Sequence, residues 1–377
     1  MGGSSSINAL VYVRGHPADF DDWQAAGADG WGWTDVEPYF RKQEDWRGPP
    51  SQARGTSGPL TVIDIADQVH PLCQNWLAAA KEIGIGLAED YNGPSMTGGM
   101  LYQLTIRDGI RASASRCYLR PALKRQNLDL VTGAHVTGLD FDGRRVTGVH
   151  YRKSGKDYLA RAGREIILSA GAVASPQILM LSGIGPEQDL SAHGIEVRQD
   201  MAAVGQHLQD HVGVDFHYRS KVPTLNQELR PWSGRVKAAL KYLTTRRGPL
   251  AHSINQGGGF FRLAKSDGPP DEQHYFSPVS YTRAPKGQRP MMSPDPFPGF
   301  LMGYSACRPT SRGEITLGSA DPFAAPRIQP NYFDTEEDQT LALAAMRFLR
   351  DLAATDAMSS VIESEFQPGP AATSDEE

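Results

Sequence analysis

The feature that most constrains the fold is the stretch IILSAGAVASPQILMLSGIGP, residues 166–186. The apolar residues 166–168 are typical of a short buried strand, and Gly171 permits a turn in which a side chain would clash. Ser175 followed by Pro176 predicts the first turn of a helix, because a hydroxyl accepts from free N–H groups and proline suits the first helical position. A strand, a turn and a helix in this order predict an α/β unit whose helix could present N–H groups to an anion.

A second glycine- and serine-rich segment opens the chain, as GGSSSINALVYVRG. Gly2 and Gly3 permit close backbone approach, and three serines supply hydroxyl and N–H donors, which suits a pyrophosphate or the edge of a planar cofactor. The plainer interpretation is a flexible lead-in to a strand, and these residues alone favour it.

The rest of the chain mixes helical and strand patterns. Apolar spacing predicts helices over 67–83, from Ser113 or Ser115 onward, over 236–243, and from an Asp334 cap to about residue 355. Alternation predicts a hairpin of strands 136–141 and 146–151 about Asp142-Gly143, and strands at 299–305 and 314–317. Together these elements predict the α/β or α+β class, followed by a disordered tail over 356–377.

Composition excludes several classes of protein. The 377 residues carry a net charge of −5, which argues against a general nucleic-acid binder. No apolar run is long enough for a transmembrane segment. Three scattered cysteines predict neither a disulfide framework nor a zinc ribbon, so we expect a reducing, cytoplasmic location.

Complete catalytic motifs are absent from the sequence. There is no G-x-G-x-x-G after a strand, no Walker loop and no G-x-S-x-G elbow. His207 and His211 flank Asp210 in an order close to an inverzincin helix, which leaves a zinc hydrolase as a remote alternative. Because no third ligand is evident, the sequence predicts no metal site, and polar residues capping a helix are the simpler interpretation.

Several stretches resemble motifs of the glucose–methanol–choline (GMC) family of flavin oxidoreductases, its choline and alcohol dehydrogenase-like members above all. GGSSSINALVYVRGHPADFDDW with GWGWTDVEPYFRKQED resembles the first family motif, and GAVASPQILMLSGIGP resembles the second. GIRASASRCYLRPAL, NLDLVTGAHVTGLDFDGRRVTGV, VGQHLQDHVGV and SRGEITLGSADPFAAPRIQPNYF follow in the family order. The resemblance covers essentially the whole chain.

The resemblance implies an FAD-dependent oxidation of a primary alcohol, choline-like, aliphatic or aromatic. Hydride passes to the flavin, a histidine takes the hydroxyl proton, and quinone or oxygen accepts the electrons. By position, the cofactor-binding residues would be Gly2, Gly3 and Ser4 at the diphosphate, Asn8, Ala9, Leu10 and Val11 along the isoalloxazine ring, and the main chain of Val136 at the adenine. Some members attach the flavin to a histidine where this chain has Ile7, so we expect noncovalent FAD.

The resemblance also implies missing parts. The family's dinucleotide fingerprint lies upstream of the first motif, and its catalytic histidine lies in a block expected beyond residue 377. We therefore expect a partial, Rossmann-like FAD-binding domain over 1–220, without its first βαβ unit and with an aromatic loop or lid over 16–60. A mixed-sheet substrate domain would follow over 221–355. The leading hypothesis is a fragment of a longer dehydrogenase, inactive alone. A noncatalytic relic or binding module is the alternative.

Overall fold

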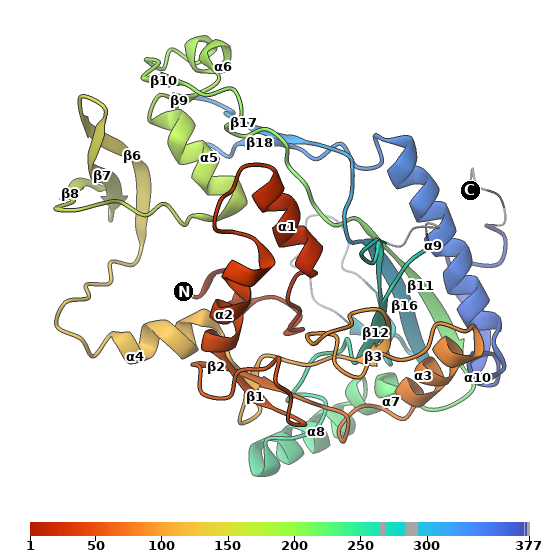
Figure 1. The fold of residues 1–377 in the computed structure, drawn as a ribbon. Coiled ribbons are helices and arrows are strands. Elements are labelled where there is room, and N and C mark those ends of the chain that lie inside the picture. Colours follow the sequence, from red (N-terminus) through yellow and green to blue (C-terminus); the bar gives the residue numbers. More distant parts are fainter. Residues whose placement is uncertain (264–267, 283–292, 373, 375–377) are drawn as a thin grey trace. The chain divides into compact units, whose positions relative to one another are not determined.

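A computed structural model describes residues 1–263, 268–282, 293–372 and 374 (Figure 1). The chain forms two compact units, each assembled from separate stretches of sequence. Unit 1 contains Met1–Ala122, His211–Arg308 and Thr340–Glu377, and unit 2 contains Leu123–Asp210 and Pro309–Gln339. These units are interleaved along the chain, whereas the predicted functional domains are continuous. The assignment of 1–220 to FAD and 221–355 to substrate stays a prediction.

Unit 1 is built on a six-stranded sheet with the order β19-β11-β16-β13-β12-β3. Its strands are β3 (Gly98–Leu101), β11 (Gly213–Ser220), β12 (Gly257–Phe261), β13 (Glu272–Ser277), β16 (Gly299–Ala306) and β19 (Ile362–Gln367). Every neighbouring pair runs antiparallel. The prediction of a mixed sheet is therefore wrong for this sheet, because each strand pairs with neighbours that run against it and none is joined by a parallel crossover.

Helices and short strands complete unit 1. The helices are η1 (Gly3–Ser6), α1 (Pro17–Ala25), α2 (Trp33–Gln43), α3 (Leu72–Glu82), η2 (Ser115–Leu119), α4 (Arg120–Ala122), α7 (Leu225–Leu229), α8 (Trp232–Thr245), most of α9 (Glu336–Ala354) and α10 (Asp356–Ser359). The short strands are β1 (Glu44–Arg47), β2 (Leu60–Ile63), β4 (Ile106–Arg107), β5 (Ile110–Arg111), β14 (Tyr281–Thr282) and β15 (Ser293–Pro294). The predicted helices over 67–83 and 236–243 are confirmed as α3 and α8. The predicted aromatic loop over 16–60 contains α1 and α2.

The terminal stretch after residue 355 is ordered through residue 372, so the expectation of a disordered tail is wrong there. Strand β19 pairs with the edge strand β11, and α10 precedes it. Helix α9 begins one residue after Thr335, whose hydroxyl accepts from the backbone N–H of Asp338. The cap is therefore Thr335, where the sequence predicted Asp334.

Unit 2 carries the predicted hairpin, with β6 (Ala134–Asp142) and β7 (Arg145–Lys153) joined at Gly143 and extended by β8 (Lys156–Arg161). Its other elements are α5 (Gly171–Leu181), β9 (Ile184–Gly185), α6 (Glu187–Ala192), β10 (Gln199–Asp200), β17 (Glu314–Thr316) and β18 (Arg327–Gln329). Gly171 has the left-handed backbone that the sequence predicted, with φ +88°. Helix α5 begins there, four residues before the predicted cap, and the hydroxyl of Ser175 accepts from the N–H of Ala170.

The buried strand predicted at residues 166–168 is not formed. No described strand pairs with this stretch, and the side chain of Ile167 is 78% exposed. A strand needs a partner for its ladder of hydrogen bonds, and this apolar run has none among the described strands.

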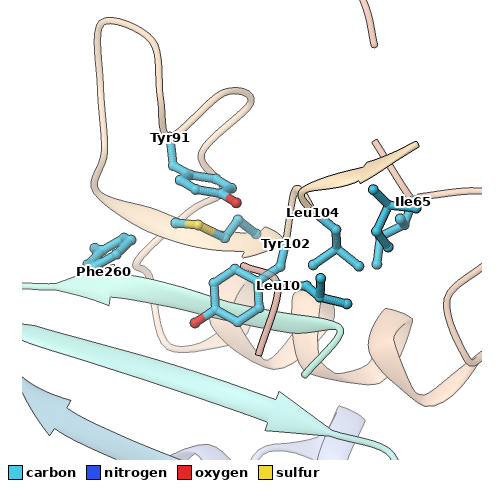
Figure 2. Close-up of a cluster of buried hydrophobic side chains, with 8 residues drawn as sticks. Leu10, Ile65, Tyr91, Tyr102, Leu104 and Phe260 are labelled. Atoms are coloured by element: carbon cyan, nitrogen blue, oxygen red, sulfur yellow. The ribbon is translucent and has the colours of Figure 1, made fainter. Parts of the chain in front are cut away.

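One apolar cluster of unit 1 joins the first residues of the chain to the edge of the six-stranded sheet (Figure 2). It consists of Leu10, Ile65, Tyr91, Met100, Tyr102, Leu104, Ile106 and Phe260. Figure 2 shows Leu10 beside Leu104 and Tyr102. Burial of this surface stabilises the packing of residue 10 on strand β3 and the residues that follow it.

Two ionisable side chains of β13 are buried without a hydrogen-bond partner among the described residues. Glu272 and His274 point to the same face of the strand, and the ring of His274 lies 5.0 Å from the rings of both Phe261 and Phe348. Among the described residues, neither carboxylate oxygen and neither ring nitrogen has a hydrogen-bond partner. Burial raises the pKa of Glu272 to about 9 and lowers the pKa of His274 to about 3. Both side chains are therefore held neutral near pH 7.

We expect these two side chains to give the free energy of unfolding opposite slopes with pH. The folded chain holds the Glu272 proton more tightly than its ordinary pKa of 4.5 allows, so stability falls as pH rises from 4.5 towards 9. The folded chain resists protonation of His274, whose ordinary pKa is 6.5, so stability also falls as pH drops from 6.5 towards 3. Each limb has a slope of at most about 1.4 kcal/mol per pH unit.

Urea unfolding between pH 4 and 9 checks this prediction. Glu272→Leu should flatten the alkaline limb and His274→Phe the acid limb, relative to wild type. The exposed substitution Glu363→Leu is the control and should leave both limbs unchanged. Limbs that persist in both buried variants would contradict the assignment.

Candidate functional site

The glycine–serine segment at the start of the chain folds into a tight exposed turn. Gly2 and Gly3 have φ values of +103° and +56°, and helix η1 follows. A Cβ atom at Gly2 would lie 2.4 Å from Ser6 Oγ and 3.1 Å from the backbone nitrogen of Ser115. Glycine at position 2 is therefore required both by backbone conformation and by close approach.

Hydrogen bonds of one arginine and one serine hold this segment in place. Arg111 Nη1 donates to the carbonyl oxygen of Ser5 at 3.2 Å and to Asn8 Oδ1 at 2.6 Å. The hydroxyl of Ser5 donates to the carbonyl oxygen of Gly2 and accepts from the N–H of Ala114 at 2.9 Å. The guanidinium thereby brings a positive charge next to the exposed glycine–serine backbone.

Leu10 marks the point where the segment enters the core. It is buried, and its φ of +70° is rare for a branched side chain. Its carbonyl oxygen accepts from both the N–H and the hydroxyl of Thr105, at 2.9 and 3.0 Å. Backbone strain of this kind persists only where surrounding contacts impose it, and it concentrates at functional sites.

The predicted cofactor residues 2–4 and 8–11 thus lie in one short stretch of unit 1. Gly3, Ser4, Asn8 and Ala9 are exposed, whereas Gly2 and Val11 are half-buried. Exposed backbone from the first turn of η1, with a guanidinium alongside, suits the negative charge of a diphosphate. The residues present therefore fit FAD, although their contacts with it stay a prediction.

A buried ionic network holds the residues that follow. Glu44 is fully buried, and its carboxylate accepts from Arg14 Nη2 at 2.5 Å and from Arg54 Nη2 at 2.5 Å. It also accepts from the N–H of Gly55 at 3.0 Å. The guanidinium of Arg54 lies 3.9 Å from the ring centroid of Trp46, a cation–π contact.

The same network reaches Gln103, two residues after strand β3, through amide side chains. Arg54 Nη1 donates to Gln103 Oε1 at 2.8 Å, and Asn92 Nδ2 donates to the same oxygen at 2.8 Å. Asn92 Oδ1 accepts from the N–H of Arg14 at 2.6 Å, and the N–H of Tyr12 donates to the carbonyl oxygen of Gln103 at 2.9 Å. Residues 12–14 are therefore held on both sides.

Val136 lies in unit 2, on β6, and pairs with Tyr151 next to a shift in register between Val136 and Gly138. Such bulges bend a strand and are frequent beside binding sites. The two units are described separately, so the proximity of Val136 to the N-terminal segment stays a prediction.

The structure does not support the alternative of a zinc hydrolase that uses His207 and His211. His207 has a left-handed backbone with φ +61°, and residues 207–212 are not helical, so the two histidines do not share a helix face. Asp210 accepts instead from the hydroxyl of Tyr332 at 2.5 Å. In the part of the chain that the structure describes, no three His, Cys, Asp or Glu side chains are placed to hold a metal.

Sequence reasoning missed the residues that hold the site in place. Arg111 and Glu44 stand only within stretches that resemble family motifs, and the sequence predicted no contact for either. A charged residue inside an otherwise apolar or aromatic run, as in VYVRG and QEDWRG, is the available signal, because buried charges require partners. Glu44 pairs with Arg14, 30 residues away, and no local pattern reveals a pairing at that separation.

Comparison with known proteins agrees with this architecture. The GMC oxidoreductase family matches residues 1–213 in its N-terminal part and residues 309–377 in its C-terminal part. The chain belongs to the GMC oxidoreductase family, a family of flavoproteins that use FAD. Helices and sheets are arranged as in formate oxidase of Aspergillus oryzae, with a TM-score of 0.89 at 29% identity over 100% of this chain and 70% of that one.

Its relatives include choline dehydrogenases. The chain is 39% identical to the oxygen-dependent choline dehydrogenase of Rhizobium johnstonii over 100% of its own length and 67% of that protein. It is 38% identical to human mitochondrial choline dehydrogenase over 100% of its own length and 62% of that protein. The chain thus spans about two thirds of the length of these relatives. In the described residues, no helix is long and apolar enough to cross a bilayer.

The network makes a direct prediction about stability. Glu44→Gln leaves the buried guanidinium of Arg14 without its carboxylate and leaves Arg54 with the carboxylate of Asp90 alone, and breaking a buried pair in this way costs about 3–5 kcal/mol. Urea unfolding should show a free energy of unfolding that is lower by this amount, seen as a lower midpoint concentration with an unchanged slope.

The matched control is Glu37→Gln on α2, which removes the half-buried partner of the exposed Arg41, 3.8 Å away. A surface pair of this kind contributes at most about 1 kcal/mol. Equal losses in the two variants would show that the network does not support the fold.

Proposed function

We propose that this chain is the part of an FAD-dependent oxidoreductase that binds the flavin and the substrate, and that the whole enzyme oxidises a primary alcohol. The substrate would be choline or a related aliphatic or aromatic alcohol, and quinone or oxygen would accept the electrons. The observation that carries the proposal is the exposed segment 2–9, which Arg111 fastens, within a chain that matches the family over residues 1–213. The choline dehydrogenase relatives support the substrate class.

Bound FAD would supply the acceptor for the hydride that leaves the alcohol carbon. The residues of this chain would bind and orient it. The N–H groups of Gly3 and Ser4 would donate to the diphosphate, and Arg111 would neutralise part of its charge. Asn8 and Leu10, one fastened by Arg111 and the other by Thr105, would keep the neighbouring backbone rigid along the ring. We assign the role of proton acceptor to no residue of this chain.

We further propose that FAD is held without a covalent bond. Ile7 stands at the position of attachment, and its side chain is 85% exposed. An aliphatic side chain offers no nucleophile to the flavin, so affinity must come from polar contacts and packing alone. Precipitation of the holoprotein with acid should therefore release all of the flavin into the supernatant.

Arg111→Gln tests the cofactor site. It removes the charge next to the glycine–serine backbone and the donor to Asn8, so it should weaken FAD binding by about tenfold or more. Flavin fluorescence during titration of the purified chain measures this affinity. Arg41→Gln, on an exposed face of α2, is the control and should leave it unchanged.

Two outcomes separate this proposal from a noncatalytic binding module. FAD binding together with reduction of an artificial electron acceptor in the presence of choline or another primary alcohol, by the chain or by a longer form that contains it, supports the oxidoreductase. FAD binding without turnover in either form supports a binding module. A wild-type chain that fails to bind FAD, or equal affinities for the Arg111 and Arg41 variants, would overturn the assignment of segment 2–11.

A further inference from the structure

Helix α8 of unit 1 carries its apolar stripe on the solvent side. Trp232, Val236, Leu240 and Leu243 fall on one face at helical spacing, with 78, 38, 58 and 65% of their surfaces exposed. Ala238, the one buried residue of this fully described helix, lies on the opposite face. A surface helix normally turns its apolar stripe towards the core. The reversed orientation of α8 marks a surface that something else covers.

The same segment is strongly basic. Residues 229–250 contain six basic side chains and no acidic one, although the whole chain has a net charge of −5. These residues are Arg230, Arg235, Lys237, Lys241, Arg246 and Arg247. Among the residues that the structure describes, Asp67 is the only carboxylate paired with any of them, through Arg247. The segment therefore presents a net positive charge beside an exposed apolar face.

The lysines lie beside open space. A groove of about 950 Å³ runs between α8 and the start of α7, and Lys237, Leu240 and Lys241 line it together with Thr224 and Gln227. The ammonium groups of Lys237 and Lys241 thus stand next to the apolar stripe. Glu228 also lines the groove, so two basic side chains share it with one acidic side chain. Long basic side chains at the margins of an apolar face can reach out to phosphate groups while their stems pack on apolar surface.

We propose that α8 docks unit 1 on the surface of a bilayer containing anionic lipid. The stripe from Trp232 to Leu243 lies among the headgroups and upper acyl chains, and the flanking lysines and arginines contact lipid phosphates. A tryptophan at the beginning of the stripe suits this interfacial depth. The helix lies in the plane of the membrane surface, because its 14 residues are too few to span a bilayer.

Charge complementarity favours lipid over other occupants. A second copy meeting α8 through a twofold interface would oppose the same basic segment to itself, with like charges in contact. A nucleic acid would satisfy the basic groups but leave the apolar stripe of Trp232 and Leu243 against phosphate and water. An anionic bilayer offers both the negative surface and the apolar interior that the two features require.

Co-flotation of the purified chain with vesicles tests the proposal. Vesicles of phosphatidylcholine with about 40% phosphatidylglycerol are compared with vesicles of phosphatidylcholine alone. The anionic lipid gives the first kind a strong negative surface charge. The wild-type chain should bind the anionic vesicles at least about tenfold more tightly, and salt should weaken the binding because it screens surface charge. A brominated lipid should quench part of the tryptophan fluorescence.

Two variants separate the contributions of the stripe and the charges. Trp232→Ser with Leu243→Ser removes apolar contact, and Lys237→Glu with Lys241→Glu reverses charge; each pair should weaken anionic-vesicle binding by about tenfold or more. Trp31→Ser with Leu87→Ser alters exposed apolar residues elsewhere in unit 1, and Lys153→Glu with Lys156→Glu reverses the charge of one half-buried and one exposed lysine in unit 2. These controls should leave binding unchanged. Because all the altered side chains of α8 are exposed, urea unfolding of both α8 variants should match wild type.

Three results would overturn the proposal. The first is a wild-type chain that does not float with anionic vesicles. The second is binding that survives both α8 variants. The third is a lipid-free dimer in analytical ultracentrifugation that Trp232→Ser with Leu243→Ser converts to monomer, because it would show that a second copy covers the stripe.

Discussion

A single buried carboxylate, Glu44, determines how the first half of unit 1 is assembled. It receives hydrogen bonds from Arg14, Arg54 and the backbone of Gly55, stretches that begin as separate parts of the chain. Removing three charges from water costs several kcal/mol for each ion, so the arrangement is stable only when every oxygen and guanidinium has a partner. This requirement fixes the register of residues 12–14 against their neighbours.

Fixing residues 12–14 has a direct effect on the candidate site, because the exposed turn at residues 2–9 is attached to them through Leu10. The strained backbone of Leu10 is held from one side by the network and from the other by Thr105. Arg111 then holds the turn at Ser5 and at Asn8. One short segment therefore contains, in order along the chain, the exposed candidate binding surface at residues 2–9, the core residue Leu10 and the buried ionic contacts of residues 12–14.

The sequence predicted those parts of the fold that depend on neighbouring residues. The hairpin about Gly143 and helices α3 and α8 follow from local periodicity and turn chemistry. The prediction of a strand at residues 166–168 is wrong because a strand depends on a partner, which periodicity cannot reveal. The sequence also did not predict the outward orientation of Leu243 or the pairing of Glu44. Both depend on which distant surfaces meet. The site segment itself was found through resemblance, whereas local rules favoured a flexible lead-in.

The strand order of the large sheet has a consequence for synthesis. Strand β3 near residue 100 forms one edge, and β19, which ends at Gln367, forms the other, next to β11. The ribosome must therefore release nearly all of these residues before the last hydrogen-bonded ladder can close. Until then β11 has an open edge that can pair with other chains, and such long-range closure is slow. Nascent chains of this protein should consequently depend on chaperones that shield strand edges during translation.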